Sequence, residues 1–247
     1  MSNLSKRNRR HDRYYKKAKE DGYASRAVYK LQELDRRFKL LRPGDRVVDL
    51  GCWPGSWLQY AGQRVGHRGM VVGLDLKAVD LRLPKQVVTI QGDVTSLPAT
   101  RIMESLGGSA DILLSDMAPH TTGVRMTDVA RSIALVERAL DLSAEVVKPN
   151  GRFLAKVFQG PGFDDLLLHA KALYRRTKAI RPKGSRSGSM ELYLVALERR
   201  LVPLPEDGND GRSESPAAHE PAAGGAQTVR TGTHERDAAH SVDENEG

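Results

Sequence analysis

Hydrophobic positions in the first 200 residues alternate between short continuous runs and longer stretches with helical spacing. The short runs have the length of buried strands and cover residues 46–50, 70–75, 86–91, 112–116, 152–158 and 192–197. Helical spacing is found over residues 28–38, 56–65, about 127–148 and about 163–175. Strands that alternate with helices favour right-handed crossovers and a largely parallel sheet covered on both faces. The predicted fold class is therefore α/β.

Local signals mark two of the helix boundaries. Ser25 precedes the first helical stretch, and its hydroxyl makes it the expected N-cap. Pro149-Asn150-Gly151 is expected to end the long helix, because proline and glycine commonly follow helix C-termini. The strand over residues 152–158 is then expected to follow directly.

The two ends of the chain differ from the middle in charge and composition. Residues 205–247 contain 10 acidic and 3 basic residues and no Leu, Ile, Met, Phe, Tyr or Trp, a composition that predicts disorder. Residues 1–204 hold 36 basic and 21 acidic residues, a net charge of +15 that favours a polyanionic partner. We expect a basic N-terminal arm (residues 1–22), one domain (residues 23–204) and a disordered acidic tail (residues 205–247).

Several classes of protein are excluded by the sequence. No apolar run approaches the roughly 18 residues that a membrane span requires, and the basic N-terminus does not lead into the apolar stretch of a secretory signal. The single cysteine, Cys52, excludes an internal disulfide framework and a Cys-based zinc cluster. We therefore expect a cytoplasmic protein with no membrane partner, and no metal site is predicted.

Ionisable residues recur where the predicted strands end, which is where ligands bind in such sheets. They are Asp49, Asp75, Asp93, Asp116 and Lys156. Lys156 lies in an otherwise apolar strand, and because a buried unpaired charge is costly we favour a functional role over a lysine that extends to solvent. Glu191 opens the last predicted strand and reaches the same edge if that strand is antiparallel. Asp93 and Asp116 remain open to a second interpretation as caps of the following turns.

A glycine-containing turn, residues 49–57, joins the first strand to a helix and brings backbone N–H groups toward a ligand. The turn lacks both the Walker pattern and the Gly-x-Gly-x-x-Gly spacing of pyrophosphate sites. Asp75, the last residue of the second predicted strand, is suited to accept hydrogen bonds from ribose hydroxyls. An adenosine ligand without a pyrophosphate, S-adenosylmethionine, fits both features. Trp53 and Trp57 lie in the same turn and either pack there or face the cationic sulfonium.

Five segments occur in an order that resembles the FtsJ-type (RlmE) family of ribosomal RNA 2′-O-ribose methyltransferases: residues 25–31, 49–57, 115–119, 156–160 and 191–193. The resemblance implies a Rossmann-like class I methyltransferase with a seven-stranded, mostly parallel sheet, an antiparallel last strand and helices on both faces. The catalytic tetrad that it implies is Lys30, Asp116, Lys156 and Glu191, with Lys156 as the proton acceptor. The contacts that it implies for S-adenosylmethionine are Gly55, Trp57, Asp75, Asp93 and Asp116.

The resemblance further implies methylation of a uridine in 23S ribosomal RNA, on the assembled large subunit, by a monomeric enzyme whose basic arm binds the RNA. The alternatives are a 2′-O-methyltransferase of the same family that acts on tRNA or an mRNA cap, and a non-catalytic RNA-binding module. A dehydrogenase would explain the fold and Asp75, but the glycine fingerprint is missing and Lys156 would have no role. The chain departs from the family at Cys52-Trp53, where small residues are usual, and at Ser56, where glycine is usual.

Overall fold

The structure is a computed structural model that describes residues 13–183 and 190–201. The chain divides into two units, Met1–Pro203 and Leu204–Gly247. The predicted disordered tail and the first twelve residues of the predicted basic arm lie outside the described residues. Within the described part of the chain, no helix is both long and apolar enough to cross a membrane.

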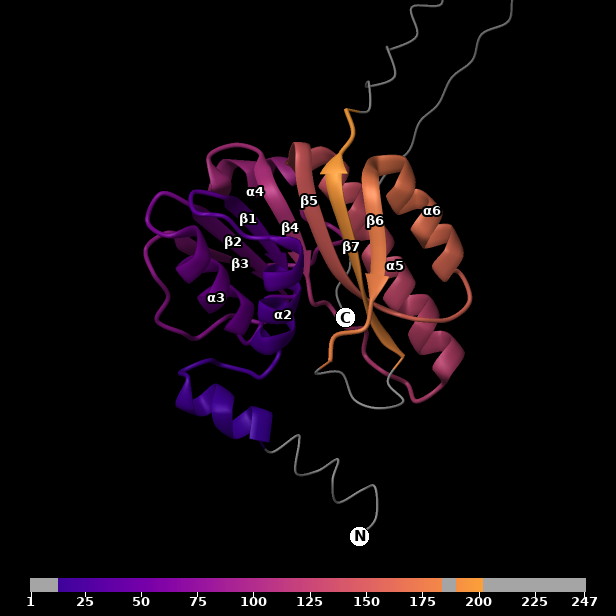
Figure 1. Ribbon diagram of the computed structural model, residues 1–247, viewed down its shortest axis with the longest axis horizontal. Helices are drawn as coiled ribbons and strands as arrows, with labels where there is room; N and C mark the ends of the chain where they lie inside the picture. The colour runs from indigo at the N-terminus through magenta and orange to yellow at the C-terminus, as the bar shows by residue number, and fades with distance from the viewer. Residues whose placement is uncertain (1–12, 184–189, 202–247) are drawn as a thin grey trace, which may run out of the picture. The chain divides into compact units, whose positions relative to one another are not determined.

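Seven strands form one sheet in the order β3-β2-β1-β4-β5-β7-β6 (Figure 1). The strands are β1 (Arg46–Leu50), β2 (Met70–Asp75), β3 (Val87–Gln91), β4 (Ala110–Ser115), β5 (Val147–Phe158), β6 (Tyr174–Ile180) and β7 (Glu191–Arg199). Strands β1 to β5 are parallel, and β7 runs antiparallel between β5 and β6. The predicted α/β class, the seven strands and the antiparallel last strand are confirmed.

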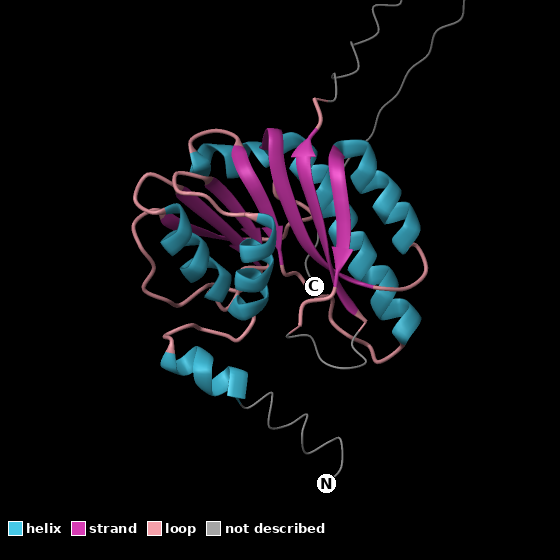
Figure 2. Cartoon of the chain, viewed as in Figure 1, coloured by secondary structure: helices cyan, strands magenta, loops and turns pink. Residues whose placement is uncertain are grey.

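Helices cover both faces of the sheet (Figure 2). One apolar cluster joins the sheet to α2 (Val28–Phe38) and α3 (Ser56–Val65). The other joins it to α4 (Ala99–Leu106), α5 (Arg125–Val146) and α6 (Phe163–Leu173). Alternate strand residues supply the two clusters, as Val47 and Val48 of β1 do, because successive side chains of a strand point to opposite faces. The sheet is therefore buried on both sides, which explains the continuous apolar runs of its strands.

The long helix ends earlier than predicted. Helix α5 ends at Val146 and β5 starts at Val147, so Pro149-Asn150-Gly151 lies inside the strand and does not end the helix. Asn150 has a φ of 60°, and the pairing of β4 with β5 shifts register between Ala110 and Ile112. The turn residues thus form an irregularity within β5. The eight-residue helix α4 was not predicted at all.

Ser25 is not the N-cap of α2. Ala27 holds that position and has no side-chain cap. The Ser25 hydroxyl instead lies 2.8 Å from the Ser56 hydroxyl at the start of α3 and accepts the Ala27 N–H at 3.3 Å. The prediction was wrong because a long-range partner 31 residues away takes the hydroxyl. As a result, the starts of α2 and α3 are tied together.

Candidate active site

The carboxyl edge of the parallel strands gathers the predicted catalytic residues. Asp116 follows β4, and its backbone N–H donates to the Leu50 carbonyl of β1 at 3.1 Å. In the antiparallel pair, Lys156 of β5 lies opposite Tyr193 of β7, and Phe158 lies opposite Glu191. Because β7 is antiparallel, its first residue reaches the edge at which β4 and β5 end.

Lys156 and Asp116 form a buried ion pair. Lys156 is only 8% exposed. Its Nζ donates to the Asp116 backbone carbonyl at 2.6 Å and lies 3.0 Å from Asp116 Oδ1. Lys156 is therefore held at the edge by two oxygens of one residue and does not extend into solvent.

Tyr193 joins this pair as a second donor to the same carboxylate. Its hydroxyl donates to Asp116 Oδ1 at 2.8 Å. Burial raises the pKa of Tyr193 well above its ordinary value, and the nearby carboxylates Asp116 and Glu191 raise it further. The phenol therefore stays protonated at neutral pH and remains a hydrogen-bond donor.

Lys30 and Glu191 form a second ion pair beside the first. Lys30 Nζ of α2 donates to Glu191 Oε1 at 2.5 Å, and both side chains are largely buried. The same Nζ lies 5.7 Å from the centre of the Tyr193 ring. Tyr193 thus contacts both ion pairs, and the four residues of the predicted tetrad are brought together around it.

Sequence reasoning missed the place of Tyr193 in this cluster. The residue belongs to the matched segment 191–193, but it was given no role. A signal was available, because Tyr193 lies two positions after Glu191 in a strand and therefore points to the same face. What the sequence could not supply was the partner, which is 77 residues away.

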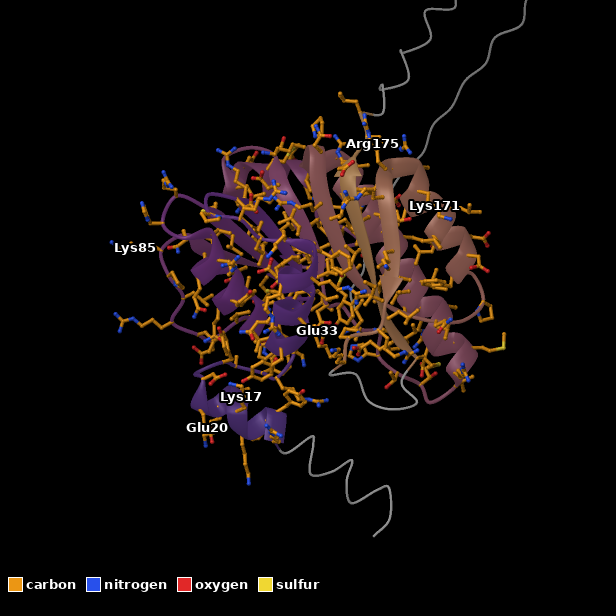
Figure 3. The ribbon with its side chains drawn as sticks, viewed as in Figure 1. Lys17, Glu20, Glu33, Lys85, Lys171 and Arg175 are labelled. Atoms are coloured by element: carbon orange, nitrogen blue, oxygen red, sulfur yellow. The ribbon has the colours of Figure 1, made fainter. Side chains whose placement is uncertain are left out.

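Helix α2, which carries Lys30, is fixed at several points. Trp57 is 3% exposed, and its indole N–H donates to the Ala27 carbonyl just before α2 at 3.0 Å. Glu33 of α2, labelled in Figure 3, is a further point. Its two carboxylate oxygens accept the Lys183 backbone N–H at 3.0 and 3.1 Å. The indole of Trp57 therefore serves as packing between α2 and α3.

Asp75 is oriented by the backbone on both sides. Its Oδ2 accepts the Trp53 N–H and its Oδ1 accepts the Lys77 N–H, both at 2.9 Å. A carboxylate oxygen has two acceptor sites, so each oxygen can accept one further hydrogen bond. Trp53 is 49% exposed, and Lys77 Nζ lies 4.4 Å from the centre of its ring. A ribose diol fits this fixed acceptor pair.

The turn that precedes α3 depends on two glycines. Gly51 has a φ of 74°, and a Cβ there would lie 2.9 Å from the Met117 backbone, so the turn lies directly against the residue after Asp116. Gly55 has a φ of 111° and is the N-cap of α3. The first-turn N–H groups of a helix have no intrahelical acceptor, so they are available to a ligand.

Asp93 acts as a loop cap in the structure. Its Oδ1 accepts the Thr95 N–H at 2.9 Å and the Thr95 hydroxyl at 2.8 Å. These hydrogen bonds lower the pKa of Asp93. Of the two interpretations left open by the sequence, the cap is present, and it does not exclude a ligand at the second oxygen.

Asp49 is an additional buried carboxyl group beneath this edge. It is fully buried in β1, opposite Gly73 of β2, and neither of its oxygens has a hydrogen-bond partner among the residues that the structure describes. Burial raises the pKa of Asp49 well above its ordinary value, and Asp116 and Asp75 add to the effect. Across residues 13–183 and 190–201, no group of His, Cys, Asp and Glu side chains is arranged to hold a metal ion.

The raised pKa of Asp49 predicts a pH-dependent stability. Because the folded-state pKa lies above the unfolded value of 3.8, folding favours the protonated form. The stabilising contribution is complete below that unfolded value and is lost as the pH rises through the folded-state pKa. We expect Asp49→Asn to gain stability relative to wild type as the pH is raised from about 4 to about 8. Urea unfolding of wild type and variant across this pH range tests the prediction. A difference in the free energy of unfolding that stays constant with pH would contradict it.

The sheet order, the antiparallel last strand, the turn before α3 and the oriented carboxylate at the end of β2 define an S-adenosylmethionine-dependent methyltransferase of Rossmann-like fold. Comparison with known families makes the assignment narrower. The chain belongs to the FtsJ-like methyltransferase family, whose model matches residues 23–199. The family that the five sequence segments predicted is confirmed.

Relatives and solved structures agree with this assignment. The ribosomal RNA large subunit methyltransferase E of Syntrophobacter fumaroxidans is 47% identical over 189 residues, which are 76% of this chain and 96% of that protein. A ribosomal RNA methyltransferase from Plasmodium falciparum aligns with a TM-score of 0.64 and 27% identity, covering 72% of this chain and 98% of that one. Aeropyrum pernix fibrillarin, solved with S-adenosylmethionine bound, shares the fold with a TM-score of 0.52 and 15% identity, covering 71% and 75% of the two chains.

Proposed function

We propose that the protein methylates the 2′-hydroxyl of a uridine in 23S ribosomal RNA, acting as a cytoplasmic monomer on the assembled large subunit. The observation that carries this proposal is the cluster of two ion pairs, Lys156–Asp116 and Lys30–Glu191, around Tyr193. The names of the relatives and the net charge of +15 in residues 1–204 support a ribosomal RNA substrate.

The residues beside this cluster fit the cofactor. S-adenosylmethionine supplies, when bound, a methyl group on a positively charged sulfur, which makes that group electrophilic. Asp75 is suited to accept the ribose hydroxyls, and Asp93 would face the adenine. The remainder of the cofactor would be held by the turn at Gly55, by the first N–H groups of α3 around Trp57, and by Asp116.

The tetrad is suited to remove a proton. A ribose hydroxyl is a poor nucleophile at neutral pH, so a positioned base must accept its proton. Lys156 would accept that proton after giving up one of its own, and so return to the ammonium that pairs with Asp116. Lys30 and Glu191, which form the ion pair beside Tyr193, would orient the hydroxyl.

Asp75→Ala is expected to weaken S-adenosylmethionine binding by about 1.5–3 kcal/mol, because hydrogen bonds to a charged acceptor are lost. Isothermal titration of the folded variant measures this change. Asp80→Ala, which removes a carboxylate from the loop after β2, is the matched control. Equal affinities for wild type and the Asp75 variant would remove Asp75 from the cofactor site.

The basic arm, residues 1–22, is proposed to contribute to RNA binding, with the methyltransferase domain at residues 23–204 and the acidic tail at residues 205–247. Residues 13–20 are helical, and Lys17 and Glu20 project from this helix (Figure 3). The Tyr14 ring lies 5.7 Å from the Tyr29 ring at the start of α2, and Lys17 Nζ lies 5.4 Å from the latter. These contacts would hold the arm's second half against the domain that carries Lys30.

The proposal is tested by the choice of substrate. The purified protein is incubated with tritiated S-adenosylmethionine and, in separate reactions, with undermethylated large subunits, protein-free 23S RNA, tRNA or capped mRNA. We expect label in the large subunits, at one uridine ribose located by primer extension at low nucleotide concentration. Preferential labelling of tRNA or of the cap would replace the proposed substrate, and RNA binding without any transfer would favour the non-catalytic module.

A further inference from the structure

The first turns of α5 hold the loop that follows Asp116. Asp128 is 5% exposed, and its Oδ1 accepts the Thr122 N–H at 2.7 Å and the Thr122 hydroxyl at 2.9 Å. Its Oδ2 accepts the Gly123 N–H at 3.3 Å. One turn further, Arg131 donates to the His120 carbonyl at 3.2 Å. The far end of the loop is therefore fixed by one carboxylate and one guanidinium.

The same turns of α5 also hold the segment that follows Lys156. The Ser132 hydroxyl accepts the Phe158 N–H at 3.0 Å. The next turn of chain packs closely on α5, since a Cβ at Gly160 would lie 2.8 Å from a Val129 methyl group. One helix end thus fixes the two chain segments that leave Asp116 and Lys156.

Two exposed apolar side chains lie where this loop passes into α5. Val124 is 58% exposed and Met126 is 69% exposed, and Arg125 between them is also exposed. Single exposed apolar residues are ordinary on protein surfaces. Here, however, Val124 is the N-cap of α5 and Met126 lies in its first turn. The loop that leads to them from Asp116 makes three hydrogen bonds to one buried carboxylate. Exposed apolar side chains next to a guanidinium suit a ligand that has a flat apolar face and a phosphate, as a nucleotide has.

We propose that residues 120–126 form a preformed binding site for one nucleotide of the RNA substrate, with Val124 and Met126 packed on the base and Arg125 on a phosphate. Asp128 is a positioning residue that acts through this loop. The inference rests on the proposed RNA methyltransferase function and adds to it a site where the protein contacts one nucleotide of the substrate strand. A preformed loop binds with less loss of conformational entropy than one that must be ordered by the RNA.

The apolar pair is tested by the double variant Val124→Ser/Met126→Ser. We expect KM for the RNA substrate to rise about tenfold, since the apolar contact with one base is lost, with kcat and S-adenosylmethionine affinity within about twofold of wild type. Leu168→Ser, which removes a comparably exposed apolar side chain from α6, is the matched control and should leave KM unchanged. A wild-type KM in the double variant overturns the site.

Asp128→Asn separates positioning from folding. The amide keeps the shape of the side chain but replaces one acceptor oxygen with a donor, so the hydrogen bonds to Thr122 and Gly123 cannot all form. We expect the RNA KM to rise in the same direction as in the double variant, measured on folded protein with unchanged S-adenosylmethionine affinity. A lower melting temperature with an unchanged KM would make Asp128 purely structural and overturn its positioning role. If the wild type methylates no RNA, the proposed function itself fails, whereas an active wild type beside an unaffected double variant overturns only the loop site.

Discussion

Lys156→Ala is expected to abolish methyl transfer while S-adenosylmethionine still binds. Truncation removes the group proposed to accept the hydroxyl proton, and general-base catalysis typically contributes about 10²–10⁴-fold in rate. The change also leaves Asp116 without the ammonium that lies 3.0 Å from its Oδ1. Rate loss at the upper end of that range is therefore expected. Tritiated methyl incorporation into large subunits measures the rate, and isothermal titration measures cofactor affinity.

Lys156→Arg distinguishes a proton-accepting role of Lys156 from a purely electrostatic one. A guanidinium keeps the positive charge and the ability to donate to Asp116, but it stays protonated at working pH and cannot accept a proton. The arginine variant is therefore expected to remain inactive. If it turned over at near wild-type rates, Lys156 would be an electrostatic positioning residue, and the base would have to be Asp116 or solvent.

Arg152→Ala is expected to lower the free energy of unfolding by about 3–5 kcal/mol, because it leaves a buried charge without its partner. Arg152 and Asp45 are each 6% exposed and joined at 2.9 Å, and Arg152 also donates to the Leu40 carbonyl at 2.7 Å. Burial raises the pKa of Asp45, and Arg152 opposes that rise. Without the guanidinium, Asp45 must either be protonated or remain as a buried charge without its ion-pair partner.

The double variant Arg152→Met/Asp45→Asn is the control. Its asparagine side chain can still accept the Arg42 N–H that Asp45 Oδ2 accepts at 2.7 Å, and its methionine fills the space of the arginine stem. Most of the lost stability should return, because replacing a buried ion pair by neutral groups is often close to neutral. Urea titration followed by circular dichroism gives the values. A loss below about 1 kcal/mol in the single variant would show that the pair contributes no more than a surface ion pair.

The strands could be predicted from the sequence because both faces of the sheet are covered. Burial on both sides makes each strand a continuous apolar run, so β1 and β2 have the bounds that the pattern gave. The failures have local causes. Helix α4 is only eight residues long, so its hydrophobic positions show too few helical repeats to be recognised. Strand β5 contains Pro149 and Asn150 within an irregularity, although these residue types are typical of a turn.

The candidate site was predictable as a set of residues but not as a set of contacts. The carboxyl ends of parallel strands meet at one edge of the sheet irrespective of side-chain contacts, so Asp116 and Lys156 could be placed together. Their pairing, and that of Lys30 with Glu191, depends on the β5–β7 register and on how α2 packs, neither of which periodicity determines. Asp128 was hidden for the same reason, since its role lies in the loop hydrogen bonds that it accepts.

The shared contact at Tyr193 determines how substitutions in the tetrad should combine. Groups that touch a common neighbour do not contribute independently, and the departure from additivity is itself a measurable coupling energy. Lys30 lies over the Tyr193 ring, and Lys156 shares with the Tyr193 hydroxyl one oxygen of Asp116. The rate losses of Lys30 and Lys156 variants should therefore not multiply in the double variant, and replacing Tyr193 with phenylalanine should shrink their coupling.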